Sequence, residues 1–188
     1  MKIGITGHTQ GFGKSLYDVF NSQKHDTLGF SRSNGFDIGN KLVRKKIINE
    51  IKDIDVFINN AYDPQGQLDI LEEVLSCWSG TEKIVVNVSS IIVNKESPYF
   101  EGELAVYRES KIKLNNIIKN YKGSVKIINI IPSLMNTNFD IIPINFDRSN
   151  SIDTDALAEL IYTMIKHHNN FFIKEIIVDN NGTFKSNL

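Results

Sequence analysis

The sequence predicts an α/β protein with a doubly wound, parallel β-sheet and helices on both faces, in a single domain over residues 1–188. Short apolar runs typical of buried strands alternate with longer segments of helical periodicity, and such alternation produces parallel sheets. A chain of 188 residues is long enough for one domain with a sizeable core. We find no repeat, linker or low-complexity segment that would divide it.

The first strand is the apolar run that begins at Lys2, and the helix after it carries Phe12, Leu16, Val19 and Phe20 at helical spacing. Further strands are predicted at residues 25–31, 55–58, 83–88, 125–131 and 171–178. Further helices are predicted to start at residues 37–40, to run through residues 68–75, and to cover residues 102–121 and 153–168. Residues 136–150 are irregular and rather apolar, and we interpret 138–146 as a substrate cover.

A glycine-rich turn joins the first strand to the first helix. Gly7 permits a tight turn, Gly11 lets the backbone approach a pyrophosphate, and Gly13 lets the helix pack closely on the strand. This layout puts a ligand phosphate at a helix N-terminus. The spacing excludes a P-loop, because His8 stands where that loop needs glycine, and it is not the G-x-G-x-x-G fingerprint either. Taken alone, the turn is also compatible with a structural bend.

Polar residues follow the predicted strand ends. Because ligands of doubly wound folds bind at the carboxyl ends of the strands, we expect these residues to line one crevice. They are the glycine turn, Arg32, Asn59-Asn60, Ser89-Ser90 and Pro132-Ser133.

Tyr107 and Lys111 lie four residues apart on the long predicted helix, so they share a face. A positive charge beside a phenol favours the phenolate, and we therefore expect Lys111 to lower the pKa of Tyr107 below its usual value of about 10. Ser90 could hydrogen-bond a substrate carbonyl next to that phenol. Each residue alone has an ordinary interpretation, as a helix-surface pair or as a hydroxyl that caps a turn.

The ordered set of motifs resembles the short-chain dehydrogenase/reductase family, in the branch with a T-G-x-x-x-G-x-G turn. Residues 6–13 match that turn in full, residues 87–90 match N-x-S-S, and residues 107–111 match Y-x-x-x-K. Residues 59–62 match N-N-A-G except that Tyr62 replaces glycine. Residues 132–137 are similar to P-G-x-x-x-T, with Ser133 in place of glycine, and residues 177–179 look like the closing strand.

This resemblance implies a Rossmann-like fold and an NAD(P)-dependent oxidoreductase that interconverts a carbonyl and an alcohol by hydride transfer. Ser90 would orient the carbonyl oxygen, Tyr107 would donate the proton, and Lys111 would hold the nicotinamide ribose. The residues implied for cofactor binding are Thr6, Gly7, Thr9, Gln10, Gly11, Phe12, Gly13, Ser31, Arg32, Ser33, Asp37, Ile38, Asn60, Ala61, Tyr107, Lys111, Pro132 and Thr137.

Arg32 follows the second predicted strand, where an acidic residue would bind a ribose 2′-hydroxyl and an arginine accommodates a 2′-phosphate. With the hydroxyls of Ser31 and Ser33 beside it, Arg32 favours NADP over the alternative, NAD. Gln10 argues the other way, because many NADP-using relatives carry a basic residue before the second glycine.

The chain also departs from the family pattern. Only residues 33–36 separate Arg32 from Asp37, so we expect the family's helix between its second and third strands to be missing and its third strand to be a remnant. The segment between Ala61 and Asn87 is also short. We find no counterpart there of the family's catalytic asparagine, which anchors a proton-relay water beside the lysine. Because this helix is shortened, the sequence does not identify the interface of a possible homo-oligomer.

Composition narrows the remaining possibilities. A formal net charge of −1 gives no reason to expect nucleic acid, and no spacing of Cys, His or carboxylates suggests a metal site. Cys77 is the single cysteine and no apolar run approaches membrane-spanning length, so we expect a soluble, cytoplasmic protein whose partner is a small carbonyl or alcohol. Two other functions remain open: a non-catalytic NADP(H) sensor or scaffold, and a nucleotide-sugar epimerase or dehydratase.

Overall fold

The computed structural model describes residues 1–94, 100–137 and 151–179, and these form a six-stranded parallel sheet. The strand order is β2-β1-β3-β4-β5-β6. The strands are β1 (Lys2–Thr6), β2 (Asp26–Phe30), β3 (Val56–Asn59), β4 (Ile84–Val88), β5 (Lys126–Pro132) and β6 (Glu175–Val178). The helices are α1 (Gly11–Ser22), α2 (Lys41–Glu50), α3 (Gly66–Cys77), α4 (Gly102–Asn120) and α5 (Thr154–Lys166), and two 3-10 helices are η1 (Arg32–Asn34) and η2 (Ile91–Asn94).

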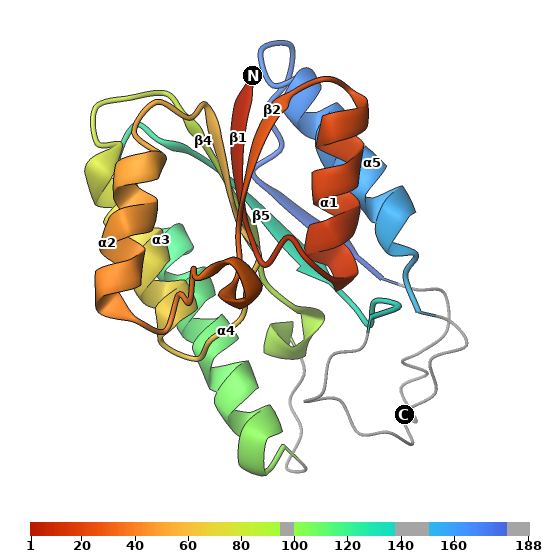
Figure 1. The fold of residues 1–188 in the computed structure, drawn as a ribbon. Helices are drawn as coiled ribbons and strands as arrows, with labels where there is room; N and C mark the ends of the chain where they lie inside the picture. Colours follow the sequence, from red (N-terminus) through yellow and green to blue (C-terminus); the bar gives the residue numbers. More distant parts are fainter. Residues whose placement is uncertain (95–99, 138–150, 180–188) are drawn as a thin grey trace.

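Helices cover both faces of the sheet, which confirms the predicted doubly wound arrangement. Figure 1 shows α1 and α5 on one face and α2, α3 and α4 on the other. Every residue of β3 and β4 is buried, as expected for central parallel strands that are covered on both sides. No helix in the described ranges is both long and apolar enough to cross a lipid bilayer.

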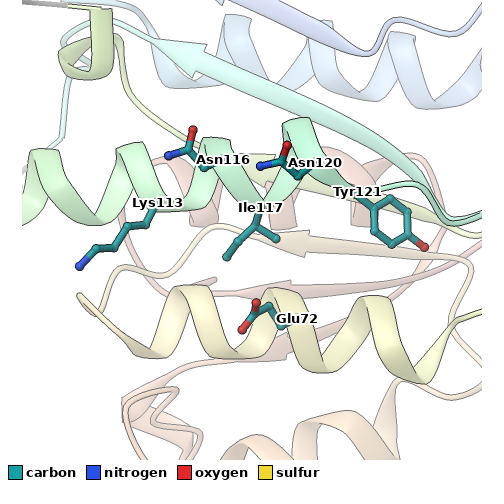
Figure 2. A pocket seen from close by; sticks show the side chains of 6 residues that line it. All are labelled: Glu72, Lys113, Asn116, Ile117, Asn120 and Tyr121. Atoms are coloured by element: carbon teal, nitrogen blue, oxygen red, sulfur yellow. The ribbon is translucent and has the colours of Figure 1, made fainter.

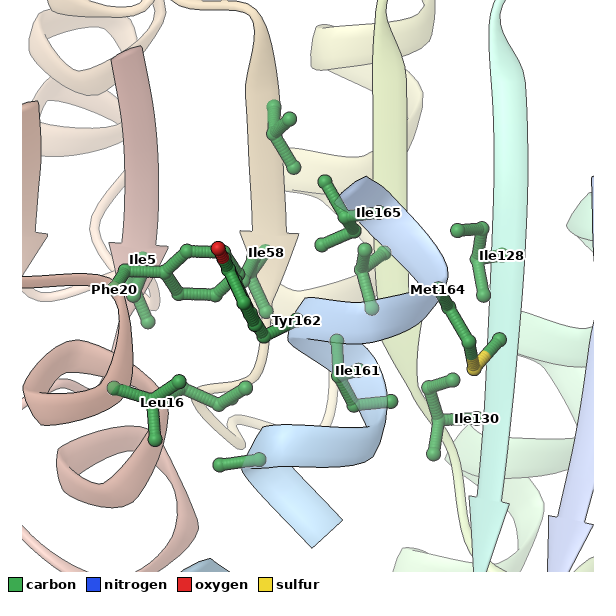
Figure 3. Close-up of a cluster of buried hydrophobic side chains, with 14 of the residues drawn as sticks. Ile5, Leu16, Phe20, Ile58, Ile128, Ile130, Ile161, Tyr162, Met164 and Ile165 are labelled. Carbon is green, nitrogen blue, oxygen red and sulfur yellow. The ribbon is translucent and has the colours of Figure 1, made fainter. Parts of the chain in front are cut away.

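Two apolar clusters, one on each face of the sheet, hold the layers together. On the face of α1 and α5, Leu16 and Phe20 pack with Ile161 and Ile165 over the strands (Figure 3). On the other face, Trp78 is 1% exposed and meets the Phe57 ring edge-on, with 6.4 Å between the ring centroids. Burial on this scale supplies most of the favourable free energy of folding.

The structure refines two boundaries predicted from the sequence. Between β2 and α2 the chain forms only η1, and residues 36–40 contain no strand, so the expected remnant of a third strand is absent. The segment instead leads into α2, and Asn40 caps that helix by accepting hydrogen bonds from the backbone of Leu42 and Val43. The last strand is also shorter than predicted, since Phe172 and Ile173 pack into the α1/α5 cluster.

Candidate active site

The glycine turn adopts a backbone that side chains would obstruct. Gly7 has a φ of +74°, in the left-handed region, and its N–H donates to the Phe30 carbonyl at 2.6 Å. A Cβ at Gly13 would clash with the Gly7 carbonyl oxygen, so the first turn of α1 packs directly on the loop. The side-chain amide of Asn60 also reaches this turn and donates to the Thr6 carbonyl at 3.0 Å.

The N-cap residue of α1 does not cap the helix with its own side chain. Gln10 makes no side-chain capping bond, and the first turn contains no acidic residue. Its backbone N–H groups and the positive end of the helix dipole therefore suit a phosphate. Lys14 pairs with Asp18 on the helix surface, and the Ser15 hydroxyl donates to Thr154 at 2.9 Å, so the Gly-Lys-Ser tail forms no phosphate loop.

Thr6 lies beneath the predicted cofactor turn. It is fully buried, and its hydroxyl accepts hydrogen bonds from the backbone N–H groups of Asn60 and Ala61, each at 2.9 Å. Thr6 therefore joins the carboxyl ends of β1 and β3 and shapes the site from below. Thr137 reaches the turn from the other side, because a Cβ at Gly11 would lie 3.2 Å from its methyl group.

At the end of β2, Ser31 is buried while Arg32 and Ser33 are exposed. The hydroxyls of Ser31 and Ser33 are 2.8 Å apart. The Asn34 side chain accepts from the Ser31 backbone at 2.8 Å and thereby fixes the turn that presents Arg32. The structure thus places the three predicted 2′-phosphate ligands together at the edge of the sheet where the glycine turn lies.

The segment predicted to meet the adenine is anchored by a buried arginine. Arg44 is 4% exposed, and its guanidinium donates to the Ile38 carbonyl at 2.8 Å. The same group pairs with Asp69 at 2.6 Å and with Glu73 at 3.2 Å, both on α3. Asp37 is exposed, and its carboxylate accepts from the Gly39 backbone at 3.0 Å.

Ser90, Tyr107 and Lys111 come together as the sequence predicts. The Ser90 side chain hydrogen-bonds the Tyr107 phenol, and the Lys111 Nζ lies 5.3 Å from the centre of the Tyr107 ring. Lys111 is 2% exposed, and its Nζ donates to the Val88 carbonyl at 2.9 Å and to Gln67 Oε1 at 2.7 Å. Helix α4 therefore projects the phenol and the ammonium toward the end of β4.

The predicted effect of Lys111 on Tyr107 is wrong. Burial raises the pKa of Tyr107 to about 12, against a smaller lowering by the Ser90 hydrogen bond. Burial also lowers the pKa of Lys111 to about 7, because both hydrogen-bond acceptors of the ammonium are neutral. Removal from water, together with the nearby Tyr62 phenol, thus outweighs the Ser90 hydrogen bond, and Tyr107 is a protonated phenol at neutral pH.

Tyr62, which replaces the glycine of N-N-A-G, covers this group. Its ring meets the Tyr107 ring edge-on, with centroids 4.9 Å apart, and the Lys111 Nζ lies 5.6 Å from its centre. Burial raises the pKa of Tyr62, and a hydrogen bond to Ser110 lowers it. Two phenol rings therefore enclose one ammonium.

Several solved structures share this architecture. A short-chain dehydrogenase/reductase from Vibrio parahaemolyticus matches with a TM-score of 0.77 and 16% identity, over 96% of this chain and 100% of that one. The chain has the short-chain dehydrogenase/reductase fold. An alcohol dehydrogenase from the archaeon Thermococcus sibiricus, complexed with 5-hydroxy-NADP, matches with a TM-score of 0.71 and 14% identity, over 100% and 99% of the two chains.

A 3-alpha-hydroxysteroid dehydrogenase from Pseudomonas sp. B-0831, complexed with NADH, matches with a TM-score of 0.70 and 18% identity, over 95% of each chain. No protein-family model and no curated protein match the sequence.

Within this short-chain dehydrogenase/reductase fold, a residue that the sequence analysis missed lies beside Lys111. Gln67 is 2% exposed, and its side-chain amide contacts Lys111 and the ends of β3 and β4. It belongs to no motif, and glutamine is an ordinary residue in the first turn of a helix. The only available signal is its place early in the helix after N-N-A-Y.

A row of buried asparagines was also missed, and it includes Asn59, which we expected to line the crevice but which is fully buried. Asn59, Asn87 and Asn129 occupy paired positions on β3, β4 and β5 and are at most 1% exposed. Asn59 donates to Asn87 at 3.2 Å, Asn87 to Asn129 at 3.0 Å, and Asn129 to Glu175 at 3.1 Å. The signal for this asparagine row was present, since Asn87 and Asn129 each interrupt a run of apolar residues and Asn59 ends one.

The surface groove between α3 and α4 does not contain the motif residues. It is lined by Glu72, Lys113, Asn116, Ile117, Asn120 and Tyr121 (Figure 2). Because the motif residues lie at the carboxyl ends of the strands and not in this groove, we take the carboxyl edge of the sheet as the candidate active site. The predicted substrate cover at 138–146 lies outside the described residues.

Proposed function

We propose that the protein is a member of the short-chain dehydrogenase/reductase family, a single NAD(P)-binding domain that interconverts a carbonyl and an alcohol, with NADP(H) favoured. The observation that carries this proposal is the hydrogen bond between Ser90 and Tyr107 beside the buried Lys111 ammonium. A nucleotide-binding module requires the glycine turn but not a phenol and a hydroxyl that are hydrogen-bonded beside a buried ammonium.

The residues present fit a nicotinamide dinucleotide. The Gln10 side chain does not cap α1, and Gly7 and Gly13 let the turn pack closely on the helix, so backbone N–H groups can hold a pyrophosphate. Arg32 would hold a 2′-phosphate, and one Lys111 N–H beyond its two protein bonds would hold a ribose hydroxyl. When bound, this cofactor would supply or accept the hydride.

The protein's own part is to position the substrate and move one proton. The Ser90 hydroxyl would hold the substrate carbonyl oxygen next to the Tyr107 phenol, and that phenol would give its proton to the oxygen as negative charge develops there. Burial raises the pKa of Tyr107 to about 12, so the phenol is protonated at neutral pH and has a proton to donate. The substrate would be a small aldehyde or ketone.

The cost of burying Lys111 supports catalysis over simple folding stability. A lysine that is 2% exposed and has only neutral acceptors destabilises the folded state at neutral pH. Strongly shifted groups of this kind concentrate at functional sites.

A second candidate is a non-catalytic NADP(H) sensor or scaffold, and one observation favours it. Lys111 lies beneath the Tyr62 and Tyr107 rings, so a cofactor hydroxyl reaches the ammonium only if part of this cover moves. Tight NADPH binding without turnover of any carbonyl would support this function instead.

The test is an NADPH-oxidation screen over small aldehydes and ketones, followed by Tyr107→Phe with the best substrate. We expect the variant to lose at least about 100-fold in kcat, because it removes the proton donor. Tyr121→Phe is the matched control, since Tyr121 ends the same helix away from Lys111 and should keep the wild-type rate. A rate for Tyr107→Phe within about threefold of wild type would contradict the assignment.

A further inference from the structure

Three elements meet around the side chain of Gln67. Its Nε2 donates to the carbonyl oxygens of Asn59 and Val88, both at 3.1 Å, at the ends of β3 and β4. Its Oε1 accepts from the Lys111 Nζ at 2.7 Å. The amide cannot be flipped, because its oxygen would then face two carbonyl oxygens and its nitrogen would face an ammonium. The amide orientation is thus determined by its surroundings.

The backbone beneath Gln67 is fixed as well. The Gln67 carbonyl accepts from the Asn59 side chain at 3.0 Å, which joins it to the asparagine row. Asp63 holds the start of α3 by accepting from the Gly66 backbone at 2.6 Å, and its carbonyl accepts from the Gln67 N–H at 3.2 Å. Both ends of the side chain are therefore held, and Oε1 has little freedom to move.

We propose that Gln67 is the positioning residue that holds the Lys111 ammonium beside Tyr107, by a direct hydrogen bond that leaves no room for a bridging water. This inference rests on the proposed function, because positioning matters only if Lys111 takes part in the reaction. Gln67 supplies the ammonium with a side-chain oxygen as hydrogen-bond acceptor. The 2.7 Å contact excludes any relay through a molecule between the two atoms.

The inference predicts how charge at residue 67 acts on Lys111. The titratable groups that face the ammonium among the described residues are the phenols of Tyr62 and Tyr107, and Asp63 and Glu103 act on Tyr62. A carboxylate in place of the Gln67 amide would lie in direct contact with Nζ and favour its charged form. Gln67→Glu should therefore raise the pH at which Lys111 titrates, and Gln67→Met should lower it by removing an acceptor.

The experiment follows the ε-carbon resonance of Lys111 by NMR in protein with ¹³C-labelled lysine, assigned with Lys111→Met. We expect the titration midpoint to move up by at least about one pH unit in Gln67→Glu and down in Gln67→Met. Gln65→Glu, an equal change of charge at an exposed residue two positions away, should leave the midpoint unchanged. If Gln67→Glu does not fold, Gln67→Met alone decides the matter.

An unchanged midpoint in the folded Gln67 variants would overturn the inference. A purely structural role for Gln67 would lower stability without moving the midpoint. The titration needs neither cofactor nor substrate, so its outcome is independent of whether the protein proves to be a reductase. If the protein reduces carbonyls, the pH profile of NADPH consumption should shift in the same direction as the midpoint.

Discussion

At the scale of single residues, Lys111 links the proposed chemistry to the free energy of unfolding. Its pKa is about 7 in the folded protein and 10.5 in an unperturbed chain. Between these values the unfolded chain binds more protons than the folded one, so this residue makes stability rise as the pH increases from about 7 to 10.5. Tyr107 acts in the opposite direction, and its contribution is lost between about pH 10 and 12.

We therefore expect Lys111→Met to gain stability relative to wild type as the pH is lowered. The free energy of unfolding of the variant, relative to wild type, should be higher at pH 7 than at pH 10 by about 2 kcal/mol or more. At pH 7 the wild type must bury a charged lysine or remove its proton in order to fold, and most of this cost disappears at pH 10. Urea denaturation at the two pH values measures this. Lys113→Met, on the exposed side of α4, is the control, and a gap for Lys111→Met that does not change with pH would contradict the pKa shift.

The sequence located these residues but not their electrostatics. The four-residue spacing of Tyr107 and Lys111 placed them on one face of a helix, and the resemblance of residues 87–90 to N-x-S-S identified Ser90. The direction of the Tyr107 pKa was wrong because burial cannot be read from that spacing. Gln67 was missed because its partners lie 8, 21 and 44 residues away in the chain, and only folding brings them together.

At the scale of elements, Arg44 joins α2, α3 and the segment that leads to the predicted adenine site. Its guanidinium is buried, whereas Asp69 and Glu73 are each about one-third exposed. Removing it would leave the Ile38 carbonyl without its donor and two carboxylates without their partner. This arrangement makes Arg44 a structural residue of the site.

We expect Arg44→Leu to destabilise the fold by about 2–4 kcal/mol, because it breaks a buried ion-pair network from one side. The midpoint of urea denaturation measures the loss. Lys41→Leu, at an exposed position on the same helix, should change stability by less than about 0.5 kcal/mol. Equal stability of the two variants would show that the Arg44 network contributes nothing.

Most elements were predictable because their apolar periodicity is strong. Helix α4 was expected at residues 102–121 and is Gly102–Asn120, and α5 was expected at residues 153–168 and is Thr154–Lys166. The predictions failed where the sequence shows neither the apolar periodicity of a helix nor that of a strand. The expected strand remnant before α2 is absent, and the start of β6 is replaced by residues that pack on α1 and α5. A local helix cap at Asn40 accompanies the first difference, and tertiary packing accounts for the second.

At the scale of the whole molecule, all the motif segments converge on the carboxyl edge of the six-stranded sheet. The glycine turn, the β2 end with Arg32, and the β4 end with Ser90 lie on neighbouring or nearly neighbouring strands. The fold retains this edge while the segment between β2 and α2 is reduced to η1 (Figure 1). The alternation of strands and helices predicts that convergence, because every parallel strand ends at the same edge.

The central claim is that this edge binds a nicotinamide dinucleotide, and calorimetric titration with NADPH and NADH tests it most directly. We expect one NADPH per chain, bound about tenfold or more tighter than NADH through the charge-assisted bonds of Arg32. Arg32→Ala should lose that preference while still binding NADH. Tight NADH with weak NADPH would contradict the role of Arg32 alone, whereas binding of neither dinucleotide would contradict the proposed function itself.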